Sequence, residues 1–264
     1  MNHRRMFVLP EDARRLVVIA DSLAFCDAKG PQLPDHPALY PNRVAAALSN
    51  ATGQRWASSV IARAGADVRD AWRWVSKDRH VKFESVAAAD AIIVAIGSFD
   101  HAPMGVPRWM EVLGGYMHPT GLRRTYRRGL HAAYPVVASA TRGRFVRTPP
   151  AEFDRLYRLL LRQVIGLTQA SAPIVAMGPT DHRSAYYGGA HPRRESRCLA
   201  QARTAAGLGV ELVDPWPLVE PHADALNPDG IHWPDPAHAA VAGALAAPLI
   251  EQLRGERPLP PLPD

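Results

Sequence analysis

Residues 16–23 read LVVIADSL, in which an unbroken apolar run at residues 16–20 is followed directly by an aspartate and a serine. Short apolar runs rich in β-branched side chains are typical of strands that are buried on both faces of a parallel sheet. Further runs of this kind occur at residues 59–62, 91–96, 174–177 and 210–213. The sequence therefore predicts five strands, with LVVIA as the first.

Segments with helical character lie between and after these runs, at residues 42–50, 68–76, 151–170, 193–206 and 237–253. The alternation predicts an α/β domain whose five-stranded parallel sheet has helices on both faces. Right-handed crossovers place the loops after the strands along one edge, where ligands bind. Functional side chains are therefore expected directly after the predicted strands.

The composition excludes several classes of protein. With 47% hydrophobic residues in 264, the chain is not disordered, and no apolar run approaches the roughly 20 residues that span a membrane. We expect no secretory signal at the N-terminus. Two cysteines, Cys26 and Cys198, cannot form a disulfide framework, which predicts a cytoplasmic protein.

The net charge of +6 is concentrated in residues 101–150, which contain eight arginines and a single acid, Glu111. We expect this segment to be an insertion within one domain at residues 1–256, followed by a proline-rich tail at 257–264. Its expected helices, at residues 108–113 and 123–134, are separated by glycines and a proline. The arginines allow three interpretations: a solvated helix face, a nucleic-acid contact, or a lid that binds carboxylates or phosphates of a substrate. The segment matches no nucleic-acid module, so we expect no nucleic-acid partner.

As a lid beside Ser22, the insertion would also supply apolar side chains to an acyl groove. The expected groove residues are Val106, Trp109, Met110, Val112, Leu113, Tyr116 and Met117.

Candidate catalytic residues occur near the two ends of the sequence. Ser22 follows the first strand, and Asp229 and His232 lie three residues apart just before the last helix. A carboxylate that holds the Nδ1–H of an imidazole leaves Nε2 free to take a serine proton. Each feature alone is a common turn or cap signature, but together they indicate nucleophilic serine chemistry.

At these residues the chain resembles the SGNH/GDSL hydrolase family. Residues 20–23 (ADSL) resemble its first block, Gly65 its second, residues 97–100 (GSFD) its third and residues 229–232 (DGIH) its last. The resemblance implies a single-domain, flavodoxin-like SGNH fold. It also implies a catalytic set of Ser22, Asp229 and His232, with an oxyanion hole formed by the backbone N–H groups of Ser22 and Gly65.

Two positions depart from that pattern. Ala20 replaces the usual glycine, and Phe99 replaces the asparagine that normally donates to the oxyanion. Loss of one such donor typically costs about 10²–10³ in rate. Ser98 and His101 are the nearest candidates for a substitute donor.

Three further stretches, residues 18–25, 186–192 and 218–233, are similar to actinobacterial diglucosylglycerate octanoyltransferases. That resemblance implies transfer of an octanoyl group, from coenzyme A or acyl carrier protein, to a glucosylglycerate-type acceptor in methylglucose lipopolysaccharide biosynthesis. The alternatives are an esterase or thioesterase, and a non-catalytic module that binds anionic sugars or nucleic acid. We expect no cofactor, and no metal because the histidines lack a familiar ligand spacing. The oligomeric state stays open.

The expected substrate contacts combine residues of the blocks, the insertion and the polar loop that follows the fourth strand. They are Asp21, Phe99, Asp100, Arg123, Arg124, Arg127, Arg128, Tyr186, Tyr187 and His191.

Overall fold

The computed structural model describes residue 10 and residues 12–106, 108–189 and 191–262, without the side chains of residues 108, 111 and 112. The central strand β1 (Arg14–Ala20) pairs in parallel with β4 (Trp56–Ala62) and β5 (Ala91–Ala95). The sheet continues through β6 (Ile174–Met177) and β7 (Glu211–Val213), in the order β4-β1-β5-β6-β7. The prediction of a five-stranded parallel sheet is confirmed. Its order is flavodoxin-like, because the chain first adds a strand on one side of β1 and then crosses to the other.

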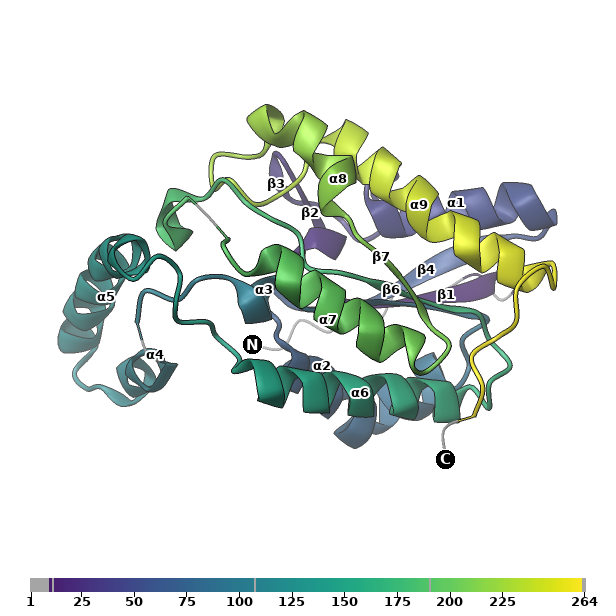
Figure 1. Cartoon of the computed structure of the whole chain (residues 1–264), viewed down its shortest axis with the longest axis horizontal. Coiled ribbons are helices and arrows are strands. Elements are labelled where there is room, and N and C mark those ends of the chain that lie inside the picture. Colours follow the sequence, from purple (N-terminus) through teal and green to yellow (C-terminus); the bar gives the residue numbers. More distant parts are fainter. Residues whose placement is uncertain (1–9, 11, 107, 190, 263–264) are drawn as a thin grey trace.

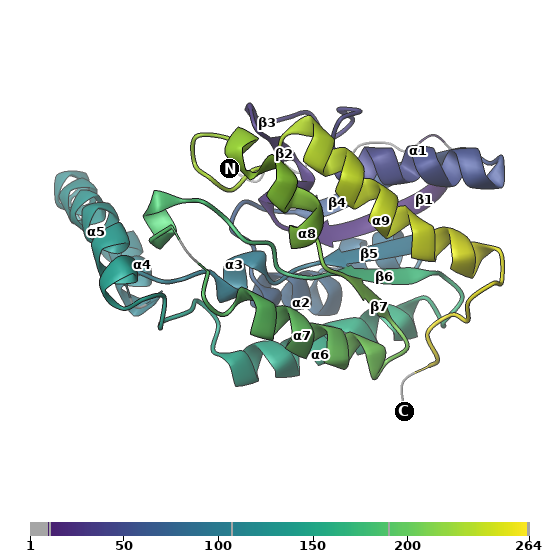
Figure 2. The same cartoon turned by 45° about the horizontal axis from the view of Figure 1, so that its top comes forward.

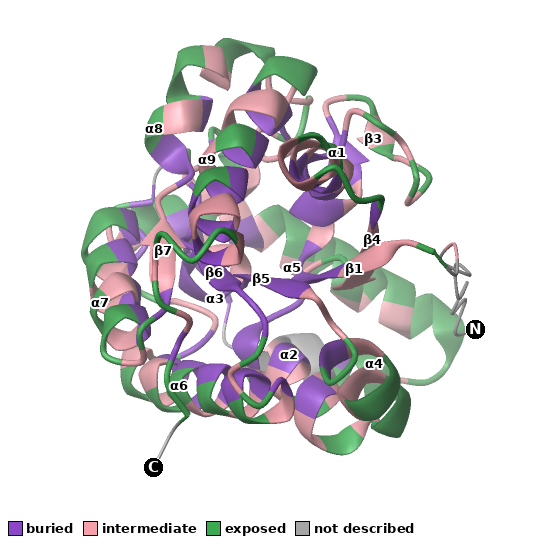
Figure 3. Ribbon diagram, turned by 90° about the vertical axis from the view of Figure 1, so that its right-hand side faces the viewer, coloured by how far each residue is buried: buried purple, intermediate pink, exposed green. Residues whose placement is uncertain are grey.

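Alternate residues of β1 enter two separate cores. Leu16, Val18 and Ala20 pack under α1 (Tyr40–Thr52), α8 (Trp216–Val219) and α9 (Asp235–Leu253). Val17 and Ile19 pack under α2 (Val68–Lys77) and α6 (Pro150–Leu167), and α7 (Arg194–Ala206) completes this layer. Figures 1 and 3 show the buried strands between the two helix layers.

Several boundaries differ from the predicted ones. The helices α1 and α9 each begin two residues early, with a proline in the first turn, a position where the missing N–H costs nothing. A π-helical segment, η2 (His80–Val86), precedes β5 and was not predicted. The other short elements are β2 (Cys26–Asp27), β3 (Gly30–Pro31) and η4 (Glu220–Ala225).

The short helix α3 (Ser98–His101) leads into the insertion, whose helices α4 (Arg108–Tyr116) and α5 (Thr120–Ala140) form a hairpin at one end of the molecule (Figures 1 and 2). The prediction that Gly114 and Gly115 end the first hairpin helix is wrong, because α4 runs through both. A Cβ on Gly114 would lie 3.2 Å from the ring of Tyr126 on α5. Gly114 therefore serves the close packing of two helices.

The hairpin shares a small core with the loop that follows β6. Met104, Val106 and Tyr134 are buried there, and Tyr186 and Tyr187 of η3 (Ala185–Tyr187) pack against them. The rings of Tyr134 and Tyr186 stack with their centroids 4.3 Å apart. The insertion is thereby attached to the body at this loop.

Beyond α9 the described chain runs without regular structure. Arg257 forms ion pairs with Glu211 and with Glu251, and Pro260 is buried. No helix within the described ranges is long and apolar enough to cross a membrane.

Candidate active site

Ser22 opens a short 3-10 helix, η1 (Ser22–Ala24), directly after β1. The turn is held by Asp21, whose carboxylate accepts a hydrogen bond from the N–H of Leu23 at 3.0 Å. Burial raises the pKa of Asp21 to about 6, although that hydrogen bond and the nearby His232 oppose the shift. Because Ser22 comes directly after β1, its half-buried side chain lies at the carboxyl end of the central strand.

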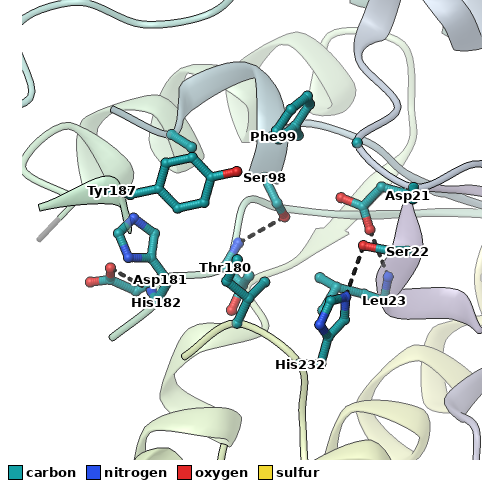
Figure 4. Close-up of a pocket in the computed structure, with 14 residues that line it drawn as sticks. Asp21, Ser22, Leu23, Ser98, Phe99, Thr180, Asp181, His182, Tyr187 and His232 are labelled. Atoms are coloured by element: carbon teal, nitrogen blue, oxygen red, sulfur yellow. Dashed lines mark hydrogen bonds between the residues drawn. The ribbon is translucent and has the colours of Figure 1, made fainter. Parts of the chain in front are cut away.

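His232 is positioned by a tight turn before α9. One oxygen of Asp229 accepts from the N–H of Ile231 at 2.7 Å, and the other lies 2.7 Å from Nδ1 of His232. Nε2 of His232 lies 3.0 Å from Oγ of Ser22 (Figure 4). The three predicted catalytic side chains thus form one hydrogen-bonded chain, the arrangement needed to take a proton from the serine.

Gly230 allows this turn to approach the loop after β6. Its φ is +72°, and a Cβ there would lie 2.6 Å from backbone atoms of Arg183 and Ser184. Its carbonyl accepts a hydrogen bond from the N–H of Arg183 at 2.7 Å. The Asp229–His232 turn is therefore fixed to residues far away in the sequence.

A pocket of about 280 Å³ opens in front of Ser22 and His232. It lies where the strand order reverses between β1 and β5, the usual ligand position in such sheets. Its lining comes mainly from the first residues after β1, β4, β5 and β6, and consists of Asp21, Ser22, Leu23, Ala64, Gly65, Ser98, Phe99, Ala102, Thr180, Asp181, His182, Tyr187, Ile231 and His232.

Gly65 faces this pocket with a left-handed backbone, at φ +64°. Within the described ranges, the backbone N–H groups of Ser22 and Gly65 donate to no protein acceptor. The ring of Phe99 packs on Gly65, so that an added Cβ would lie 3.1 Å from it. On the Phe99 ring lies the guanidinium of Arg147, 4.3 Å from the ring centre.

The two neighbours of Phe99 that could replace an oxyanion donor lie in different places. Ser98 lines the pocket, and its Oγ accepts from the N–H of Thr180 at 3.2 Å. His101 is buried against Phe153, with ring centres 4.2 Å apart, and is not among the described lining residues.

Asp100, an expected substrate contact, lies beneath the pocket and not in its described lining. Its carboxylate is fully buried and accepts hydrogen bonds from the N–H of Val68 at 3.0 Å and from Thr148 Oγ1 at 2.5 Å. Burial raises the pKa of Asp100 to about 7. These contacts give Asp100 a structural position, where it ties the start of α2 to the end of the insertion.

The polar loop after β6 sends only part of its expected residues to the pocket. Tyr187 lines it, whereas Tyr186 stacks on Tyr134 and places its hydroxyl 3.2 Å from Nδ1 of His131. His191 is buried behind the described lining, where burial and the neighbouring His182 lower its pKa to about 3.

The arginine cluster of the insertion (Arg123, Arg124, Arg127 and Arg128) lies on α5, outside the described lining of the pocket. Three of these side chains are exposed and Arg123 is intermediate. Trp109, Leu113 and Tyr116 of the expected acyl groove are also exposed, whereas Val106 and Met110 pack in the hairpin core. Among the residues that the structure describes, Ala102 is the contribution of residues 101–150 to the pocket wall.

Thr180 and His182 line the pocket but were not among the predicted substrate contacts, although we expected the polar loop at residues 181–192, which includes His182, to lie at the ligand edge. Their position after a buried strand was the available signal, because the first residues after each strand reach this edge. Within the described part of the chain, no group of three or more His, Cys, Asp or Glu side chains is arranged to hold a metal ion.

Two known proteins are similar to this chain in sequence over nearly its whole length. The diglucosylglycerate octanoyltransferase of Mycolicibacterium hassiacum is 32% identical over 241 residues, which cover 89% of this chain and 95% of the relative. The protein of that name from Mycobacterium tuberculosis is 31% identical, over 89% of this chain and 92% of its own. No protein-family model matches the chain.

Solved structures with the same fold are much more distant in sequence. A lipase/acylhydrolase from Enterococcus faecalis superposes with a TM-score of 0.54 at 12% identity, covering 92% of this chain and 97% of its own. A protein described as a GDSL-like lipase from Parabacteroides merdae gives 0.58 at 13% identity, over 92% of this chain and 97% of its own. These likenesses confirm the predicted SGNH-type fold. The identity to the two mycobacterial proteins, over about nine-tenths of the sequence, shows that this chain belongs to the diglucosylglycerate octanoyltransferase family, a family of acyltransferase enzymes.

Proposed function

We propose that this chain transfers an octanoyl group from an activated donor to a glucosylglycerate-type acceptor through an acyl-enzyme on Ser22. The observation that carries the proposal is the hydrogen-bonded chain Asp229–His232–Ser22, with links of 2.7 and 3.0 Å, at the mouth of a pocket. The octanoyl group and the acceptor class are taken from the names of the two relatives. The pathway we propose is methylglucose lipopolysaccharide biosynthesis.

In the first half-reaction, Oγ of Ser22 attacks the donor's carbonyl carbon while Nε2 of His232 takes the hydroxyl proton. Collapse of the tetrahedral intermediate breaks the bond to the leaving group, and His232 returns the proton to that group. Asp229 keeps the imidazole oriented and stabilises its protonated form. The product is an octanoyl ester on Ser22 and a free thiol or alcohol.

In the second half-reaction, the acceptor hydroxyl binds beside His232 and the acyl-serine, in the position that the donor's leaving group occupied before. His232 removes its proton, the hydroxyl oxygen attacks the acyl-serine carbonyl, and the proton returns to Ser22 as the ester bond to the serine breaks. Atoms balance without a metal or redox cofactor. If water attacked in place of the sugar, the same residues would act as an esterase or thioesterase, which is the second candidate function.

The backbone N–H groups of Ser22 and Gly65 are the oxyanion donors in this proposal. Their lack of acceptors within the described ranges supports that role, because donors aimed at a developing charge must be available to it. The ring of Phe99 offers no donor and instead narrows the pocket beside Gly65. The apolar wall that includes Leu23, Ala64 and Phe99 fits the start of an acyl chain.

We place the reaction in the cytoplasm, with octanoyl coenzyme A or octanoyl acyl carrier protein as donor. Cys26 and Cys198 are both free and buried, which fits a reducing compartment.

The experiment that tests the proposal compares wild type with Ser22→Ala. We expect wild type, incubated with an octanoyl thioester, to gain one octanoyl group on the peptide that contains Ser22, and to pass it to glucosylglycerate. Ser22→Ala should lose both steps, by about 10⁶ in rate, while keeping the wild-type Tm. Retained transfer by Ser22→Ala would exclude the serine mechanism. If the enzyme formed free octanoate at the same rate with and without glucosylglycerate, the hydrolase would be favoured. A Ser22 that no fluorophosphonate labels would favour the non-catalytic binding module.

A further inference from the structure

The wall of the pocket away from Ser22 is polar and comes from the loop after β6. Thr180, His182 and Tyr187 lie there, with Ser98 beside them, and Figure 4 shows these side chains across the pocket from Ser22 and His232. The catalytic steps described above use none of them. These polar side chains are therefore available for another role in the pocket.

The ring of His182 has one hydrogen-bond donor, and its contacts show which nitrogen it is. Its Nδ1 accepts a hydrogen bond from the N–H of Ser184 at 3.3 Å, so the ring proton resides on Nε2. The side chain is 4% exposed, and Nε2 has no partner in the described part of the chain. Burial and the positive charge of Arg183 lower the pKa of His182 to about 4, so the ring is neutral at physiological pH.

Thr180 stands next to this donor with a second unused polar atom. Its side chain is also 4% exposed, and Oγ1 has no hydrogen-bond partner among the described residues. A hydroxyl both donates and accepts. Buried polar atoms in proteins are nearly always paired. Thr180 and His182 both line the pocket, so a ligand bound against this wall could supply the partner that each of the two atoms lacks in the described part of the chain.

An acyl chain cannot be that ligand, because its methylene groups would leave both atoms unpaired. A sugar can, because each hydroxyl accepts from an N–H and also exchanges a hydrogen bond with a threonine. We propose, resting on the proposed function, that Thr180 and His182 form the subsite for a hydroxyl of the sugar acceptor. The pocket then has two parts, an apolar wall for the acyl chain and a polar wall for the acceptor.

The backbone holds this subsite in register with the catalytic base. The N–H of Arg183, next to His182, donates to the carbonyl of Gly230 at 2.7 Å, and Gly230 lies within the Asp229–His232 turn. A sugar bound to Thr180 and His182 is therefore held at a fixed position relative to Nε2 of His232. Such positioning favours attack by the sugar over attack by water.

The test measures binding without catalysis, by calorimetric titration of glucosylglycerate into Ser22→Ala protein. Adding Thr180→Val, which is nearly isosteric, should weaken binding about tenfold, as should adding His182→Phe. His182→Gln places an amide N–H near the position of Nε2 and should restore most of the affinity.

Matched controls come from the core. His238 is also buried, and its Nδ1 accepts from the N–H of Tyr40 at 3.3 Å, but the ring interacts with the backbone of Cys26 and does not line the pocket. Thr168 is a buried threonine on the helix α6 side of the molecule, away from the pocket lining. His238→Phe and Thr168→Val should leave the affinity for glucosylglycerate unchanged.

Unchanged affinity in both Thr180→Val and His182→Phe would overturn the subsite, as would an equal loss in the His238→Phe control. Absence of any glucosylglycerate binding to Ser22→Ala would also overturn it. These outcomes are separate from the proposed serine mechanism, whose test is acylation of Ser22 in the wild type.

Discussion

Two neighbouring strands, β1 and β5, end at the same edge of the sheet, and the segments that follow them differ in length and in where their side chains lie. After β1, Asp21, Ser22 and Leu23 all line the pocket within three residues. After β5, Ser98, Phe99 and Ala102 line it, and the chain then leaves for the α4–α5 hairpin with its arginine cluster. For these two segments, the residues nearest the strand end line the pocket, and the arginine cluster farther along the chain lies outside the described lining.

The difference separates two kinds of contribution to function. Side chains at the strand ends are held by hydrogen bonds at the pocket, where the proposed reaction takes place. The arginine cluster, outside the described pocket lining, can act on charged ligands through the field it creates in solvent, which salt screens over about 10 Å.

Asp229→Asn should lower kcat by about 10⁴, because an amide cannot hold His232 in the tautomer that takes the serine proton. The measurement is the rate of octanoyl release from p-nitrophenyl octanoate. A loss below tenfold would remove Asp229 from the catalytic chain.

Gly65→Ala should lower kcat about 10²-fold, because the added Cβ would meet Phe99 at 3.1 Å and shift the N–H that faces the pocket. Gly53→Ala is the matched control: Gly53 has φ +67°, close to the +64° of Gly65, but no atom lies within 4 Å of its added Cβ. Both variants should lose similar stability from the left-handed backbone, and only Gly65→Ala should lose activity. Equal activities would show that Gly65 is a turn residue only.

Replacing Arg123, Arg124, Arg127 and Arg128 together by glutamate should lower kcat/KM for an octanoyl coenzyme A donor less than tenfold at low ionic strength. The loss should disappear at 0.5 M salt, since screened charges no longer steer an anionic donor. Activity on the uncharged p-nitrophenyl ester serves as the control and should not change. A salt-independent hundredfold loss would place these arginines in contact with bound substrate.

Asp100→Asn tests the buried carboxylate beneath the pocket through stability. Because burial raises the pKa of Asp100 to about 7, the folded protein holds a proton that the unfolded chain releases near pH 4. The contribution of Asp100 to stability is therefore present below pH 4 and falls as the pH rises towards 7. The Tm of Asp100→Asn relative to wild type should increase between pH 5 and 7 and level off above pH 7. Parallel curves would contradict the raised pKa.

The sequence predicted the parts of the fold that short patterns specify. All five strands overlap the apolar runs that predicted them. The inner strands β5 and β6 are buried and apolar throughout, whereas the edge strands β4 and β7 are only partly buried and include polar residues. The positions of Ser22, Asp229 and His232 relative to the strands and helices predicted that the three residues form one site.

Contacts between segments distant in the sequence could not be predicted in the same way. The role of Gly114 depends on Tyr126 across the hairpin, and the burial of Asp100 depends on Val68 and Thr148. The polar loop that contains His182 was expected at the ligand edge, but nothing in the sequence singled out Thr180 and His182, because their role depends on the pocket that they line.

The shared core of the hairpin has a consequence for shortened versions of the chain. Tyr134 of α5 supports Tyr186, and the next residue, Tyr187, is part of the pocket wall. Deleting residues 108–140 would therefore strip the support from that wall as well as removing the arginines. Such a deletion cannot assign a loss of activity to either cause, whereas point substitutions on the outer surface of α5 leave the tyrosine stack in place.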